Sequence, residues 1–206
     1  MEISGLGAIA ILAFPETEIY PRLTRAALAE IGEHLTVIED SGCFTGVVIA
    51  ANSRSFATGA DLEEVTQLAG FAAREFARAG QTLLRGIATF SLPVVAAIRG
   101  YCLGGGLDLA LACQGRVASY DSSFGHPGPT LGLITGWGGT RRLPSRLGRA
   151  AALQILLTGE RIPATQAFTL GLVDELVPAA DLVSAAARRI QREDRRHEPR
   201  NSKLKT

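Results

Sequence analysis

Three consecutive glycines stand directly before a carboxylate and an apolar run in the segment YCLGGGLDLALAC, residues 101–113. Glycine is a poor helix former, so three in a row cost backbone entropy unless the bare backbone has a use. At a helix start, Gly105 would have a free N–H and no side chain to keep a ligand away, in the positive potential of the helix dipole. Asp108 falls in the first turn, either as a proton-transfer group or as a carboxylate that complements the dipole.

A second glycine-marked loop, SRSFATGADLEEV, covers residues 53–65. Asp61 followed by Glu64 resembles a capping box, so a helix should begin at Leu62. Ala60 then lies just before that start, where backbone N–H groups lack intrahelical partners, and Gly59 permits an unusual turn. Taken alone, this loop is also consistent with a strand, a turn and a capped helix that have no further role.

A third loop, SFGHPGPTLGLITGWGGTRRL at residues 123–143, is dense in Gly and Pro and should be irregular up to a helix around Gly139. His126 is the histidine that lies near a glycine loop. None of the three loops has the phosphate-binding patterns G-x-x-x-x-G-K-[ST] or G-x-G-x-x-G, or the G-x-S-x-G elbow of serine hydrolases. The glycines therefore do not serve those chemistries.

Short apolar strands alternate with helical segments along the chain, which implies an α/β fold. The N-terminal stretch MEISGLGAIAILAF lacks the basic region and cleavage pattern of a signal peptide and is interpreted as a strand. The predicted strands are Ala8–Ala13, Gly46–Ala50, Val94–Ile98 and Arg116–Ser119, and the predicted helices are Arg22–His34, Phe71–Thr89, Leu107–Cys113 and Ala150–Leu157.

The 206-residue composition, 47% hydrophobic and 20% charged with a net charge of +1, is typical of a soluble globular protein. It gives no electrostatic case for nucleic acid, and no apolar stretch is long enough for a membrane helix. Cys43, Cys102 and Cys113 resemble neither a disulfide framework nor a zinc site, so a cytoplasmic location is expected. Residues 1–190 are predicted to form a single domain, followed by a polar, disordered tail at 191–206.

Taken together and in this order, the loops resemble the motifs of the crotonase superfamily, which contains the enoyl-CoA hydratases and isomerases. FATGADLEE is similar to the first motif, GYCLGGGLDLALAC to the second and FGHPGPTLGLITGWGGTRRL to the third, and LLTGERIPATQAFTLGLVDELV is similar to the usual continuation. The resemblance covers roughly residues 40–180. It implies a spiral of ββα units, with a shortened C-terminal helical region here, and assembly as a homotrimer or a dimer of trimers.

The resemblance also implies a site. Two backbone N–H groups, which by motif position belong to Ala60 and Gly105, would bind the carbonyl oxygen of an acyl-CoA thioester and stabilise its enolate, with Asp108 as the catalytic carboxylate. No metal or redox cofactor is implied, because coenzyme A enters as part of the substrate. The motif residues expected to contact the substrate are Ala57, Gly59, Asp61, Leu62, Gly104, His126, Pro127, Gly128, Leu131 and Gly132.

One departure from the family pattern bears on the reaction. Hydratases of the family use two glutamates, of which the first maps onto Asp108 and the second onto Gly128, which has no side chain. His126, two positions earlier, could substitute for the missing group. The sequence thus predicts hydration or a double-bond shift of an enoyl-CoA, with decarboxylation or non-catalytic acyl-CoA binding as alternatives.

Overall fold

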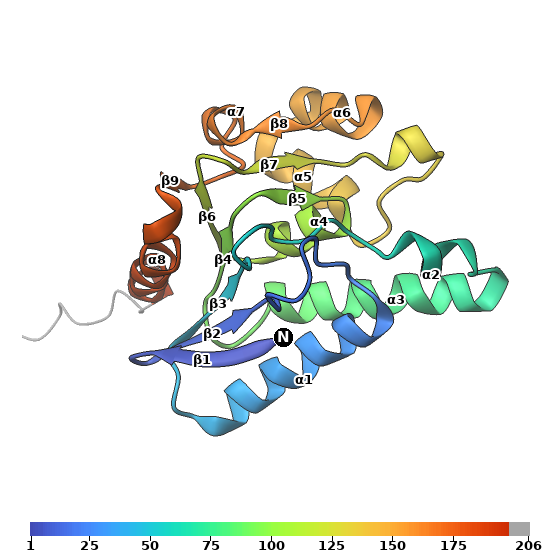
Figure 1. Ribbon diagram of the computed structural model, residues 1–206. Coiled ribbons are helices and arrows are strands. Elements are labelled where there is room, and N and C mark those ends of the chain that lie inside the picture. The colour runs from blue at the N-terminus through green and yellow to red at the C-terminus, as the bar shows by residue number, and fades with distance from the viewer. Residues whose placement is uncertain (198–206) are drawn as a thin grey trace, which may run out of the picture.

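The main sheet is the centre of the fold (Figure 1). The computed structural model describes residues 1–197, with side chains to residue 192. Strand β1 is antiparallel to β2, and the other neighbouring pairs are parallel. In spatial order the strands are β1 (Glu2–Leu6), β2 (Ile9–Ala13), β3 (Gly46–Ala50), β4 (Val94–Ile98), β6 (Gly115–Ser119) and β9 (Glu175–Val177).

A second, smaller sheet contains β5 (Tyr101–Leu103), β7 (Ser123–Gly125) and β8 (Ile162–Pro163). β4 in the main sheet is followed by β5 in the small one and then by helix α4 (Gly105–Ala112). β6 and β7 repeat this step before α5 (Gly139–Leu147), and β3 is followed by a parallel bridge from Ala57 to Cys102. This repetition is the predicted spiral of ββα units, and the α/β fold class is confirmed.

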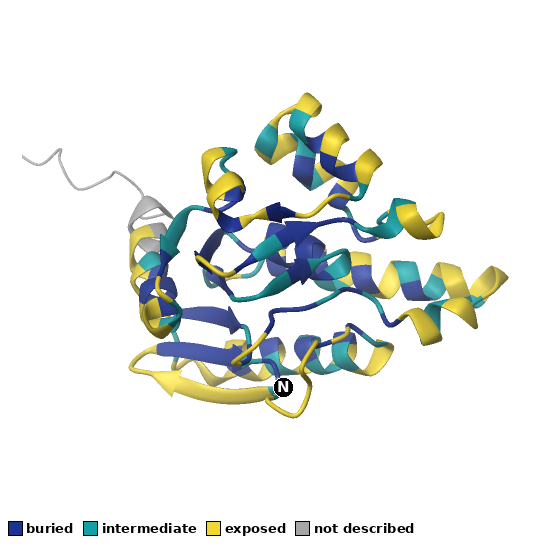
Figure 2. Ribbon diagram, turned by 45° about the horizontal axis from the view of Figure 1, so that its top comes forward, coloured by how far each residue is buried: buried dark blue, intermediate teal, exposed yellow. Residues whose placement is uncertain are grey.

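Helices cover both faces of the main sheet, as a parallel sheet requires. α1 (Arg25–Ser41), α3 (Gly70–Ala88) and α4 contribute to the larger core cluster, and α8 (Leu182–His197) packs its apolar face against β3, β4 and β6 on the other side (Figures 1 and 2). The remaining helices are α2 (Leu62–Thr66), α6 (Arg149–Thr158), α7 (Ala164–Thr169) and the short 3-10 helices η1 (Gly128–Leu131) and η2 (Ala179–Asp181).

Two predictions about the chain ends need correction. The N-terminal stretch forms a hairpin rather than one strand, because Gly7 adopts a φ of 60° and turns β1 back onto β2. α8 continues through residues 191–197, which the sequence assigned to the tail. Ala186 and Ile190 of this helix are buried against the sheet, while Arg188 and Arg192 are exposed. Residues 198–206 lie outside the described residues.

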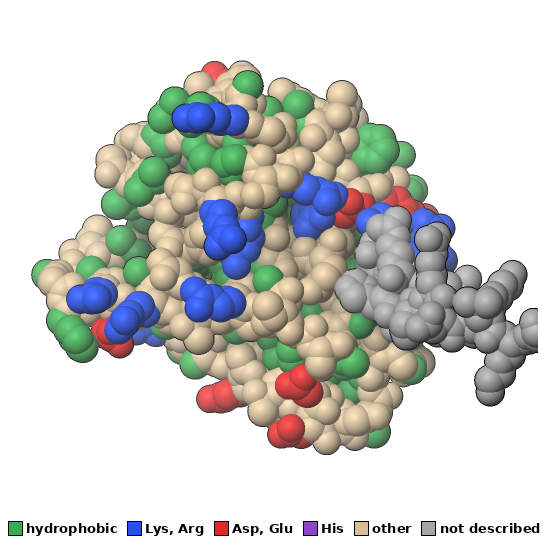
Figure 3. Space-filling view, turned by 180° about the vertical axis from the view of Figure 1, so that it is seen from behind, with side chains coloured by type: hydrophobic (Ala, Val, Ile, Leu, Met, Phe, Trp, Pro, Cys, Tyr) green, Lys and Arg blue, Asp and Glu red, His purple; other side chains and the backbone are tan. Residues whose placement is uncertain are grey.

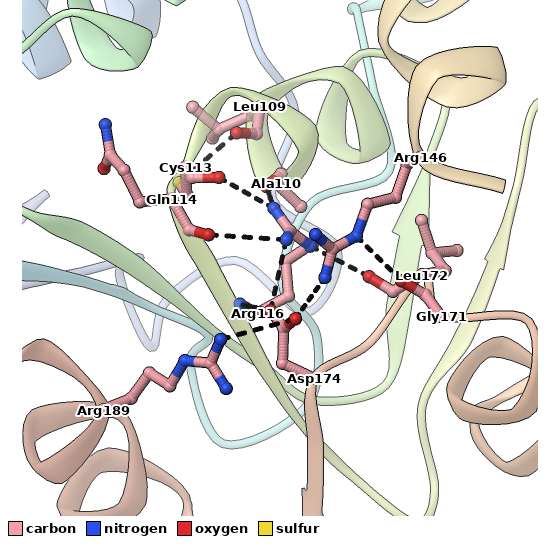
Figure 4. A network of polar contacts seen from close by, with 10 residues as sticks. All are labelled: Leu109, Ala110, Cys113, Gln114, Arg116, Arg146, Gly171, Leu172, Asp174 and Arg189. Atoms are coloured by element: carbon pink, nitrogen blue, oxygen red, sulfur yellow. Dashed lines mark hydrogen bonds and ion pairs between the residues drawn. The ribbon is translucent and has the colours of Figure 1, made fainter. Parts of the chain in front are cut away.

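A buried network of hydrogen bonds and ion pairs around Arg116 connects β6 with the end of α4 and with α5 (Figure 4). The guanidinium of Arg116 on β6 is 3.1 Å from a carboxylate oxygen of Asp174 and donates to the backbone oxygens of Cys113 and Leu172, at 2.7 and 2.9 Å. Arg146 of α5 also pairs with Asp174. The network therefore fixes the end of α4 relative to α5, the two helices whose N-termini meet at the site.

The surface carries both signs of charge. On the face in Figure 3, arginine side chains stand over the middle of the molecule, and a group of acidic side chains lies toward its lower edge. In the described part of the chain, no helix is long and apolar enough to span a membrane.

Candidate active site

A cavity of about 540 Å³ lies where the glycine-marked loops meet. Its walls come from the loop before α2, from α2 and α3, from the start of α4, and from the chain between β7 and α5. Apolar side chains dominate the lining, and a few polar groups converge on it, as in typical small-molecule sites. The predicted site residues that line it are Gly59, Ala60, Leu62, Gly104, Gly105, Asp108, His126, Pro127, Gly128 and Leu131.

Two backbone amides lie side by side on the cavity wall. A methyl group on Gly59 would lie 3.1 Å from the amide nitrogen of Gly105, and one on Gly105 would lie 3.5 Å from the amide nitrogen of Ala60. Gly105 is the first residue of α4, so its N–H has no partner within the helix. Gly59 and Gly104 have φ of 105° and 52°, which only glycine adopts readily, and these turns bring the amides together.

Trp137 closes the cavity behind these amides. A methyl group on either Gly105 or Gly80 of α3 would overlap its indole ring. The ring of Phe76 meets the indole edge-on, with 5.3 Å between the centroids. Gly105 is therefore required twice, once for access to its amide and once for the close approach of Trp137.

Asp108 is a buried carboxylate. The Thr135 hydroxyl donates to Oδ2, and Oδ1 has no side-chain hydrogen-bond partner. Burial raises the pKa of Asp108 from 3.8 to about 6, and the Thr135 hydroxyl, the Arg142 guanidinium and the backbone amides of Trp137 and Gly139 oppose that rise. The N-terminus of α5 at Gly139 also faces the carboxylate and favours its charge. Asp108 is consequently mostly ionised at neutral pH and can accept a proton.

His126 lies against this carboxylate. Its Nε2 is 3.4 Å from Oδ1 of Asp108, and the two side chains are 3% and 1% exposed. Burial lowers the pKa of His126 to about 4, so the imidazole is neutral at pH 7. The sequence placed both residues near glycine loops, and the structure brings them into one pair across 18 positions of the chain.

Three residues expected to contact the substrate do not line the cavity. Ala57 is fully buried, and its backbone pairs with Tyr101 and Leu103, which supports the glycine run from beneath. Asp61 caps α2 by accepting from the amides of residues 63 and 64, as predicted. Gly132 ends η1 with a φ of 69° and is not among the residues that line the cavity.

The sequence reasoning missed several lining residues. Thr135 and Trp137 lie within the third motif, but nothing in their spacing singled them out, because an irregular loop has no side-chain period. Phe76 lies within the predicted helix Phe71–Thr89, where it packs in the core, and it also lines the cavity. The buried face of α3 is thus the signal that could identify this wall of the cavity.

The family model for enoyl-CoA hydratase/isomerase matches residues 7–202 of the chain. The chain belongs to this family. A crotonyl-CoA hydratase from Syntrophomonas wolfei is 36% identical over 176 residues, which are 85% of this chain and 68% of the relative. The crystal structure of an enoyl-CoA hydratase from Bacillus anthracis superposes with a TM-score of 0.87 at 30% identity, over 93% of this chain and 75% of that one. The Pseudomonas aeruginosa protein DspI superposes with a TM-score of 0.88 at 27% identity, over 96% and 81%.

Within this enoyl-CoA hydratase/isomerase fold, the position of Gly128 has no room for a side chain. Its backbone oxygen accepts from the amide of Leu133 at 2.9 Å, which closes the loop around η1. A Cβ on Gly128 would lie 2.8 Å from the backbone oxygen of Leu133, a distance that real Cβ atoms do not adopt. A second carboxylate at the position that the family resemblance assigns to Gly128 would therefore require this loop to move.

Proposed function

We propose that the protein binds an acyl-CoA thioester in the cavity and forms its enolate. The thioester oxygen would accept hydrogen bonds from the amides of Ala60 and Gly105, and Asp108 would carry the proton. One observation carries the proposal: two neighbouring amides and a buried carboxylate share one cavity. Negative charge on the thioester oxygen grows as the enolate forms, and each fixed donor contributes roughly 3–4 kcal/mol in comparable sites.

The proton chemistry fits a single carboxylate. In hydration, the oxygen of water adds to the β carbon, one proton of that water is transferred to the carboxylate of Asp108, and the same proton then passes to the α carbon of the enolate. The proposal assigns no step to a metal or a redox cofactor, because amide donors and a proton carrier suffice for this chemistry.

A double-bond shift is the second candidate, and the lack of a side chain at Gly128 is compatible with it. The shift removes a proton from the γ carbon and returns one to the α carbon, so a single carrier serves both steps. Since the loop at Gly128 has no room for a second carboxylate, a reaction that needs only one proton-carrying side chain fits the residues of this cavity.

Exchange of the α protons of a saturated acyl-CoA in deuterated water tests enolate formation directly, whichever reaction follows. The wild-type protein should catalyse exchange. Gly105→Ala should abolish it, because the added methyl group overlaps Trp137 and displaces the α4 amide. Gly86→Ala on α3 is the matched control, because a methyl group there contacts nothing within 4 Å. Absence of exchange across a series of chain lengths, or exchange indifferent to Gly105, would refute the proposal.

We also propose that the chain assembles as a homotrimer or a dimer of trimers, in keeping with its family. Phe71, Ile134 and Leu157 support association, because their large apolar side chains are 78%, 73% and 71% exposed in the single chain. Light scattering at micromolar concentration tests this, and a clean monomer would contradict it.

A further inference from the structure

We propose that Asp108 and His126 form one proton-holding unit, in which His126 passes protons between the cavity and Asp108. The role of this unit in turnover rests on the proposed function. Its structural claim, that a single hydrogen bond alternates in direction between the two side chains, concerns the free protein and can be tested on it.

The two facing atoms are close but form no hydrogen bond with each other in the structure. Oδ1 of Asp108 and Nε2 of His126 are 3.4 Å apart and both are buried without a side-chain partner, while the backbone amides of Trp137 and Gly139 act on the Asp108 carboxylate. Thr135 occupies Oδ2, so Oδ1 is the oxygen left for a proton. A buried donor or acceptor without a partner is costly, and one hydrogen between these atoms satisfies both.

The close approach of α5 leaves room for a hydrogen and little else. A methyl group on Gly139 would overlap Oδ1 of Asp108 and lie 2.9 Å from Nε2 of His126. Gly139 thus allows the helix N-terminus to cover the pair and keep water from the space between the two atoms. The pair is built into the packing of the site and does not depend on a flexible side chain.

The hydrogen between the two atoms has two arrangements. When Asp108 is ionised, Nε2–H of His126 donates to Oδ1, and Nδ1 carries a lone pair. When a proton binds at Nδ1, the Nε2 proton moves to Oδ1, and the neutral carboxyl group then donates to Nε2. One proton has entered, the carboxylate has been neutralised, and the imidazole is neutral before and after. The reverse sequence releases the proton from Nδ1.

The surroundings favour storage of the proton on the carboxyl group. Burial holds the pKa of His126 near 4 and that of Asp108 near 6, so a proton that enters the pair rests on Asp108. The other titratable groups that face Asp108 are Arg142 on α5, which favours the carboxylate, and Cys102 on β5, whose thiol stays neutral because burial raises its pKa. Arg85 of α3 acts on Arg142.

Nitrogen-15 NMR of histidine-labelled protein tests the pair, because the two neutral tautomers have different nitrogen shifts. The sequence has three histidines, so His126→Gln assigns the signal and His34→Gln on α1 is the control. In the wild type, His126 should change from the Nε2–H to the Nδ1–H tautomer as the pH falls from 8 to 5. In Asp108→Asn the side-chain amide donates to Nε2, so the Nδ1–H tautomer should persist across this range. A tautomer that does not change in the wild type, or that changes equally in Asp108→Asn, would overturn the proposal.

A second readout separates the relay from a structural role. Glutamine at 126 retains a side-chain N–H that can reach Oδ1 but cannot pass a proton on, so α-proton exchange should fall about 10²-fold. The pH profile should also change shape, while the NMR spectrum of the remaining residues stays native. Exchange at the wild-type rate with the wild-type pH profile would overturn the relay. A tautomer change in a protein that shows no exchange with any acyl-CoA would support the pair and refute the proposed function.

Discussion

Replacing Asp108 by asparagine should stabilise the protein while removing its proton carrier. The side chain is 1% exposed, and burial raises its pKa from 3.8 to about 6. Since one pKa unit corresponds to about 1.4 kcal/mol, the folded protein at pH 8 has a cost of about 3 kcal/mol for holding this carboxylate ionised. Asparagine has nearly the same shape and can accept from Thr135, so Asp108→Asn should recover about 2 kcal/mol of unfolding free energy.

The unfolding free energy gained by Asp108→Asn should depend on pH, in a direction that follows from the raised pKa of Asp108. Between pH 4 and 6 the folded protein holds a proton on Asp108 that the unfolded chain releases, so this residue contributes less stability as the pH rises. The advantage of Asp108→Asn should therefore be largest above pH 7 and about half as large at pH 5. His126 acts in the opposite direction, because its pKa is lowered to about 4 and its contribution is lost as the pH falls from 6.5. In the wild type, the opposite effects of Asp108 and His126 on the pH dependence of the unfolding free energy largely cancel. Asp108→Asn should therefore lose stability more steeply than the wild type as the pH falls.

Urea unfolding at pH 5 and pH 8 measures both effects, with Asp40→Asn on the exposed side of α1 as the control. Turnover of an acyl-CoA by the same variant should fall about 10²–10⁴-fold, because a general acid–base group is removed. An Asp108→Asn variant that is less stable than the wild type at pH 8 would refute the reasoning, because it would mean that the carboxylate is well compensated in the folded protein.

Three further predictions follow from single contacts. Thr135→Val removes the hydroxyl that opposes the rise in the pKa of Asp108, so the acid limb of the pH–rate profile should move about half a unit or more to higher pH. Gly128→Glu should lower the urea midpoint without creating a fast hydratase, because its Cβ would lie 2.8 Å from the backbone oxygen of Leu133, and a faster enzyme would show that the loop moves freely. Asp174→Asn leaves the buried guanidinium of β6 without its carboxylate and should cost about 3–5 kcal/mol in urea unfolding, whereas a cost below about 1 kcal/mol would contradict the network in Figure 4.

Much of the sheet could be predicted from the sequence, because buried parallel strands are short, continuous apolar runs. Gly46–Ala50 and Val94–Ile98 have the predicted bounds, and both have every residue buried. α4 begins at Gly105, two residues before the predicted start. The low helix propensity of glycine predicts a later start, but close packing against Trp137 and the neighbouring loop stabilises the helix at these glycines. Local propensity failed here at a residue whose role is set by tertiary contacts.

The site could be predicted only in part, for a related reason. Ala60, Gly105 and Asp108 each lie at or near a helix start, which sequence patterns mark well. Thr135 reaches Asp108 through a loop whose course depends on the positive φ of Gly132 and Gly138, and no residue pattern encodes that course. The irregular loop therefore supplies the contacts that sequence reasoning missed.

The departures from the family pattern at this site are best understood together. The start of α5 lies close to the carboxylate of Asp108, because a methyl group on Gly139 would overlap Oδ1. This oxygen lies 3.4 Å from Nε2 of His126. Gly128, for its part, lets the loop close tightly enough to keep this end of the cavity covered by η1. An aspartate, a histidine and a glycine in these places therefore form one packed arrangement, and under the proposed function the buried Asp108–His126 pair would hold the proton for which the family resemblance implies two glutamates.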